Sequence, residues 1–118
     1  MGDNININAQ GDVAYGKDQA TVTINKTIQK SDASDDLKAK LEQLTQAVEA
    51  MTKEMPPDGA EDARDNLEKL VTEATKEKPK RKWYSLSGEG LIEAAKALGT
   101  LGKPVIDTTQ SVLKLLGA

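Results

Sequence analysis

The sequence contains no cysteine, no histidine and no phenylalanine in 118 residues, and it has only one tryptophan and two tyrosines. Without cysteine, disulfide bonds cannot form. Without cysteine or histidine, the ordinary zinc, haem and iron–sulfur sites are excluded. The absence of histidine also removes the usual base of a nucleophile–base pair. We therefore expect a protein with no cofactor and no enzymatic activity.

The shortage of aromatic side chains also limits the core that a single chain can build. Only Tyr15, Trp83 and Tyr84 carry large rings, and such rings normally supply much of the buried area. Small domains with thin cores depend on disulfides, metals or partners. Since the first two are excluded here, we expect homo-oligomers.

Long apolar runs are absent as well. Residues 1–10 are polar and show no basic region followed by an apolar stretch, so they do not resemble a secretory signal. No segment approaches the roughly 18 apolar residues of a membrane-spanning helix. The expected location is the cytoplasm, with peripheral association at a membrane left open.

Charge is distributed unevenly along the chain, whose net charge is -3. Residues 31–77 are acidic, whereas Lys78, Lys80, Arg81 and Lys82 form a short basic run. Because the remainder is not basic, nucleic acid is not an expected partner.

Residues 1–30 form the first expected segment, a strand-rich region that assembles between chains. Isoleucine and valine alternate with asparagine and threonine around residues 4–8 and 21–25, with glycine-containing turns between them. Strands this short are marginal alone, and their open edges favour pairing with another chain. A polar, loosely ordered tail is the alternative. The expected β interface consists of Ile5, Ile7, Val13, Val22 and Ile24.

Residues 31–78 form the second expected segment, a coiled-coil-like helical hairpin. Ser34 or Asp35 is suited to cap its first helix, and apolar residues then recur at spacings of four and three. The turn at residues 56–59 precedes a second helix over residues 60–77. The apolar seam can be used within the hairpin or between copies, and an interface between copies would use Leu37, Leu41, Leu44 and Val48.

A basic joint at residues 79–82 leads to the third segment, residues 83–118, with one or two amphipathic helices. Ser87 is a suitable cap for a helix over residues 88–98, and a last helix is expected over residues 105–116. The expected apolar stripes contain Leu91, Ile92, Leu98, Val105, Ile106, Val112, Leu113 and Leu116. The fold class predicted by all three segments is α+β, mostly α.

The joint also offers a surface for a membrane or a protein partner, formed by Lys80, Arg81, Lys82, Trp83 and Tyr84 together with the apolar stripes of the C-terminal helices. Lysine and arginine attract anionic head groups, and tryptophan and tyrosine favour the interface. The alternative is a solvated linker followed by ordinary core helices.

Several short motifs give the chain a resemblance to known proteins. The opening Gly2-Asp3-Asn4-Ile5-Asn6-Ile7 precedes the helical hairpin, and Lys82-Trp83-Tyr84-Ser85-Leu86-Ser87 and Gly90-Leu91-Ile92-Glu93-Ala94-Ala95 follow it. In this organisation the chain resembles small bacterial proteins of conflict or defence systems. The resemblance implies adaptor work in which assembly brings partners together.

These observations predict a non-enzymatic, homo-oligomeric interaction module. The alternative is a membrane-active effector whose residues 83–118 enter a bilayer after oligomerisation. Oligomer mass and vesicle binding distinguish the two.

Overall fold

A computed structural model describes residues 22–117, and within this range the chain forms helices joined by short connections, with no β-strand. The prediction of an α+β fold is therefore wrong for the described part, which is all-helical. Residues 22–30 are helical, and the following elements are α2 (Asp35–Thr52), α3 (Pro57–Ala74), α4 (Arg81–Lys96), the 3-10 helix η1 (Gly99–Gly102) and α5 (Lys103–Leu115).

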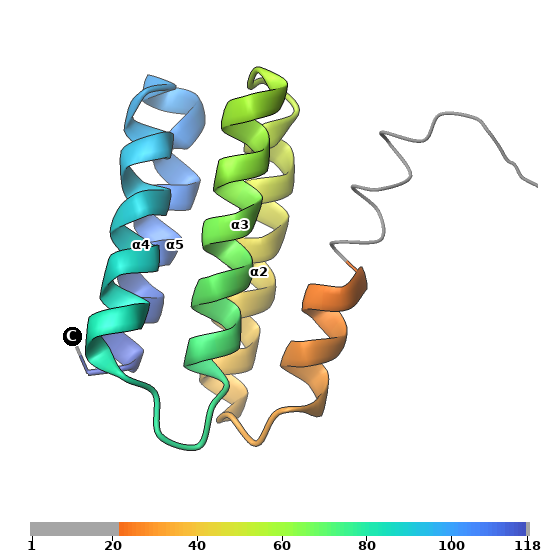
Figure 1. Ribbon diagram of the computed structural model, residues 1–118, viewed down its shortest axis with the longest axis vertical. Coiled ribbons are helices and arrows are strands. Elements are labelled where there is room, and N and C mark those ends of the chain that lie inside the picture. Colours follow the sequence, from red (N-terminus) through yellow and green to blue (C-terminus); the bar gives the residue numbers. More distant parts are fainter. Residues whose placement is uncertain (1–21, 118) are drawn as a thin grey trace, which may run out of the picture.

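The four long helices form a bundle in which neighbours in sequence run in opposite directions (Figure 1). In this view α3 and α4 lie in front, and α2 and α5 lie behind them. Contacts join α2 to α3, α3 to α4, α4 to α5, and α5 back to α2. Each helix therefore packs on two others, as in an up-down-up-down four-helix bundle.

The predicted strand at residues 21–25 is corrected by the structure, which makes residues 22–30 a helix beside α2. Ile24 and Ile28 are buried in the common core, whereas Val22 is exposed. Their spacing of four residues matches one turn of a helix. The burial of both side chains in the core outweighs the strand-like alternation, which involves only Val22 and Ile24. Lys38 Nζ donates to the Gln29 carbonyl at 3.4 Å and links this segment to α2. The other predicted strand residues, Ile5, Ile7 and Val13, lie outside the described residues.

The predicted helical hairpin is present as α2 and α3. The Ser34 hydroxyl accepts a hydrogen bond from the Leu37 amide at 3.2 Å, so the predicted cap is confirmed. The second helix begins at Pro57, three residues before the predicted start. Proline suits the first turn of a helix, where its missing N–H has no partner to lose.

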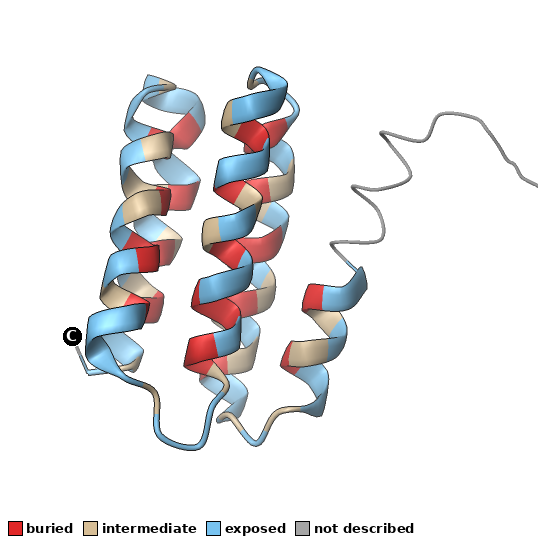
Figure 2. Cartoon of the chain, in the orientation of Figure 1, coloured by how far each residue is buried: buried red, intermediate tan, exposed pale blue. Residues whose placement is uncertain are grey.

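The core lies between the helices of one chain, along their inward faces (Figure 2). The first hairpin contributes a seam of large aliphatic side chains: Leu37, Leu41, Leu44, Val48, Met51, Leu67, Leu70 and Val71. The second contributes Tyr84, Leu91, Ala95, Val105 and Val112. Aliphatic packing thus replaces the missing aromatic rings, and in this fold the seam of α2 faces helices of its own chain.

Helix α4 begins at Arg81, which extends it well before the predicted start at residue 88. The prediction that Ser87 caps this helix is therefore wrong. Ser87 is buried inside α4, where its hydroxyl donates to the Trp83 carbonyl at 3.0 Å. Burial of Tyr84 and Leu91 explains why the helix forms through a serine- and glycine-rich sequence of low intrinsic propensity.

The connection from α4 to α5 depends on glycine. A Cβ atom at Gly102 would lie 1.9 Å from the Ala95 carbonyl oxygen, so only a hydrogen fits there. Gly99 adopts φ 61°, a left-handed conformation that glycine accepts without a steric penalty. These two glycines allow η1 to turn the chain tightly back onto α4.

Candidate interaction surface

A groove of about 490 Å³ lies between α3 and α4 on the surface of the bundle. Two large apolar side chains lie along it, Trp83 with 47% of its surface exposed and Leu86 with 60% exposed. The groove is lined by Asn66, Glu68, Lys69, Thr72, Glu73, Trp83, Leu86 and Ser87.

The register of α4 explains why these side chains face solvent. Tyr84 and Leu91 point into the core, which turns Trp83 and Leu86 toward the groove on the neighbouring face. Residues three apart lie on the same side of a helix. The Lys82 ammonium lies 5.1 Å from the Trp83 ring centroid, a cation–π distance that orients the half-exposed indole.

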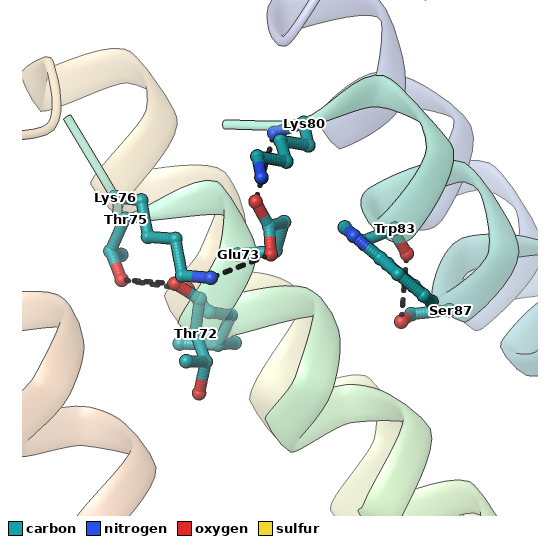
Figure 3. Close-up of polar contacts among 8 residues, drawn as sticks. Thr72, Glu73, Thr75, Lys76, Lys80, Trp83 and Ser87 are labelled. Atoms are coloured by element: carbon teal, nitrogen blue, oxygen red, sulfur yellow. Dashed lines mark hydrogen bonds and ion pairs between the residues drawn. The ribbon is translucent and has the colours of Figure 1, made fainter. Parts of the chain in front are cut away.

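Glu73 forms the polar floor of the groove at the end of α3 (Figure 3). Its buried carboxylate accepts a hydrogen bond from the Lys80 backbone N–H at 2.8 Å and another from Lys76 Nζ at 2.9 Å. The Lys80 backbone hydrogen bond, and then the Lys76 ammonium, lower the pKa of Glu73. The carboxylate therefore holds the connection between α3 and α4 in place and positions the first turn of α4, which carries Trp83.

The hydrogen bonds of Glu73 give its side chain a structural role. Both of its oxygens are already engaged, one by a backbone amide and one by an ammonium. Across the described part of the chain, no three acidic, histidine or cysteine side chains gather closely enough to hold a metal ion. The chemistry available in the groove is thus apolar contact from Trp83 and Leu86, with charges at its margins.

No family model, curated protein or solved structure matches this chain. The geometry of the bundle and the groove is therefore the basis of the functional argument.

The residues of the predicted surface at the basic joint do not all lie on one surface of the structure. Lys80, Arg81, Lys82 and Trp83 are exposed at the start of α4, so the structure brings these four together. Tyr84 is buried instead, and its hydroxyl donates to the Leu116 carbonyl at 3.0 Å. Of the predicted aromatic pair, one ring faces the groove and the other ties α4 to the end of α5.

The predicted C-terminal stripe lies mainly in the core. Leu91, Val105 and Val112 are fully buried, whereas Ile92, Leu98, Ile106, Leu113 and Leu116 are half-buried. In the range 22–117, the structure contains no helix with the length and apolar character needed to cross a bilayer.

Of the residues that line the groove, only Trp83 was predicted as a contact residue, and Leu86 is the large apolar side chain that sequence reasoning missed. It follows Trp83 by three residues, a helical spacing that would have revealed it if α4 had been predicted to begin at residue 81. The glycine and serine residues around it indicated a loop instead.

Proposed function

We propose that this chain is a non-enzymatic interaction module that assembles with copies of itself. The observation that supports this proposal is the pair Trp83 and Leu86, two exposed apolar side chains on α4 that lie beside the same groove, whereas the other exposed large apolar side chains, Val22, Leu101 and Leu115, do not line it. Exposed apolar groups gathered at one site are typical of protein contact surfaces, and tryptophan is enriched among the residues that dominate binding.

The side-chain inventory supports a binding role over catalysis. The chain has no histidine or cysteine, and the groove carboxylate, Glu73, is occupied by two hydrogen bonds. A catalytic carboxylate usually has a pKa moved toward neutrality, whereas the pKa of Glu73 is lowered. This direction fits a structural group that is charged at neutral pH.

We place this assembly in a bacterial defence or conflict system, on the resemblance of its motifs to proteins of that kind. In such a role, assembly would bring a partner protein to the bundle. The groove gives that partner, or a second copy, an apolar site with adjacent charges.

The direct test is the mass of the full chain in solution. Light scattering coupled to size-exclusion chromatography, over a wide range of loading concentrations, should give particles heavier than the 12.7 kDa monomer. The fraction of heavier particles should rise with concentration, because association follows mass action. A folded 12.7 kDa particle at every concentration would contradict the proposal.

A second candidate function is contact with an anionic membrane surface. It is favoured by the exposed cluster Lys80, Arg81, Lys82 and Trp83 at one end of α4, because each basic residue near such a surface contributes about 1 kcal/mol. Deeper insertion would require the bundle to open, since Leu91 and Val112 are buried in it. Flotation with phosphatidylserine vesicles at low salt tests this candidate, and protein that stays with the soluble fraction would reject it.

A further inference from the structure

The exposed side of α4 carries a charged stripe in addition to its apolar groove. Lys82, Leu86, Glu89 and Glu93 follow one another at spacings of four, three and four, and all four are exposed. This is the spacing of a coiled-coil seam. The stripe begins with a basic residue, continues through a leucine and ends with two acidic residues. Its charge therefore changes from positive to negative along α4.

The neighbouring side of α3 carries charges of both signs. Glu68 and Lys69 both line the groove beside Leu86 and Trp83, and Asp62 is exposed nearer the beginning of α3. We define the α3–α4 face as the exposed sides of these two helices with the groove between them. Its charge direction is carried by α4, which is basic at Lys82 and acidic at Glu89 and Glu93.

We infer that the α3–α4 face binds the same face of a second copy in an antiparallel arrangement, with Lys82 of each copy beside Glu93 of the other. This inference rests on the proposed self-assembly and assigns it a surface. A two-fold axis across the middle of the face brings each basic end to an acidic end. A parallel arrangement would instead place like charges together.

The dimensions of α4 suit this arrangement. Lys82 and Glu93 are eleven residues apart, which is about three turns and roughly 16 Å along the helix axis. The axis falls midway between them, close to Leu86 and Glu89. Leu86 of the two copies then lies near the centre and Trp83 flanks it, so apolar contact is surrounded by ion pairs.

Intrachain pairing leaves Glu93 available for this contact. Lys96 Nζ lies 3.5 Å from Glu93, but the two side chains are 62% and 75% exposed, and exposed ion pairs of this kind are weak. On α4 itself, Lys82 contacts the Trp83 ring, which directs both groups toward the same side.

A membrane is a poorer fit for the whole face than a second copy. The basic end attracts an anionic surface, but Glu89, Glu93 and Asp62 lie on the same face and are repelled by it. A second copy satisfies both ends at once. With two large apolar side chains from each copy, we expect a weak dimer that dissociates upon dilution.

A charge-swap experiment on the full chain tests this inference. Sedimentation equilibrium would compare the wild type with Lys82→Glu, Glu93→Lys and the double variant that carries both changes. Each single change should raise the dimer Kd at least tenfold, because like charges then meet at both ends of the symmetric contact. The double variant should recover dimerisation, since it restores opposite charges with their positions exchanged.

Two further variants test whether the effects are specific to the α3–α4 face. One changes the net charge outside the face, and the other changes an apolar side chain within it. Lys114→Glu on α5 changes net charge as Lys82→Glu does, at an exposed site outside the α3–α4 face, and should leave the Kd unchanged. Leu86→Ser should raise the Kd at least tenfold while circular dichroism keeps its helical signal, since Leu86 is already 60% exposed.

The outcomes distinguish this inference from the proposed function. A dimer that persists unchanged in Lys82→Glu, Glu93→Lys and Leu86→Ser would overturn the α3–α4 face and leave self-assembly standing elsewhere in the chain. A double variant that stays monomeric would also overturn it. A wild type that is monomeric throughout would reject both proposals, and phosphatidylserine-vesicle binding lost in Lys82→Glu would then assign this end of α4 to a membrane.

Discussion

The two hairpins of the bundle achieve close packing by opposite means. In α2 and α3, large aliphatic side chains at heptad-like spacing fill the interior. In α4 and α5, the chain approaches itself through small residues, with Gly102 against Ala95 and Gly88 against Leu113. The first hairpin depends mainly on the volume of its side chains, and the second also depends on glycine positions where no side chain fits. We therefore expect two kinds of substitution to destabilise the bundle. One removes side-chain volume from the first hairpin, and the other adds side-chain volume to the second.

The largest effect is expected when volume is removed from the first hairpin. Leu44 is fully buried in α2, so Leu44→Ala should lower the free energy of unfolding by about 4 kcal/mol through lost apolar burial and a residual cavity. Urea unfolding followed by circular dichroism measures this change. A loss below 1 kcal/mol would mean that the seam of α2 is not packed as described.

The converse change adds a single methyl group to the second hairpin. Gly102→Ala would place a carbon atom against the backbone of Ala95, and we expect a loss of about 3 kcal/mol because the backbone must shift. The matched control is Gly59→Ala in α3, where the nearest atom is the flexible end of Met55 at 3.3 Å.

That control should stabilise the protein by about 0.5 kcal/mol, since alanine restricts the unfolded chain and suits a helix. Equal effects of the two glycine substitutions in urea unfolding would remove the contrast between the hairpins.

The connection between the hairpins should make a pH-dependent contribution to the free energy of unfolding. Folding lowers the pKa of Glu73, so its contribution to stability is present above the ordinary glutamate pKa of about 4.3 and is lost as pH falls through the lower folded value. At pH 7, Glu73→Gln should cost about 1.5 kcal/mol, because the charged hydrogen bonds to Lys80 and Lys76 are weakened.

Thermal or urea unfolding of wild type and Glu73→Gln at pH 7 and near pH 2.5 measures this dependence. The difference between them should be smaller at the lower pH, because the stability that comes from a lowered pKa is lost as pH falls through the folded value. Glu77→Gln, at an exposed position in the same connection, serves as the control and should change stability by less than about 0.5 kcal/mol. A difference for Glu73→Gln that is equal at both pH values would contradict the assignment.

The smallest effect is expected at the end of the second hairpin. Tyr84→Phe removes the hydroxyl that donates to the Leu116 carbonyl and keeps the ring in the core. We expect a loss of about 1 kcal/mol, the typical contribution of one hydrogen bond. Hydrogen exchange should show faster opening of the last turn of α5, whereas unaltered exchange there would mean that the hydrogen bond does not hold this turn.

The contrast between the hairpins also explains which parts of the fold the sequence could predict. Periodic leucines and the Ser34 cap predicted α2 correctly, because both signals are local. The same periodicity could not show that this seam faces α5 as well as α3. Residues 21–25 were predicted to form a strand because Val22 and Ile24 alternate with polar residues over a short stretch, whereas burial of Ile24 with Ile28 decides in favour of a helix.

The start of α4 shows a further limit of prediction from sequence. A proline, a run of bases and several serines and glycines indicate a break, yet Arg81 already begins the helix. Contacts outside the helix supply the missing stability, among them the hydrogen bond from the backbone of Lys80 to the carboxylate of Glu73 and the one from Tyr84 to the distant Leu116 carbonyl. An exposed Trp83 was one of two alternatives offered by the sequence, and its alignment with Leu86 depends on this early helix start.

The position of Trp83 has a practical consequence for optical measurements. It is the only indole in the chain, and it lies half-exposed at the groove. Its fluorescence spectrum therefore reports on that single site, without background from the interior. Any molecule that covers the ring should shift the emission to shorter wavelength and shield it from iodide quenching, so unlabelled protein carries its own probe of occupancy.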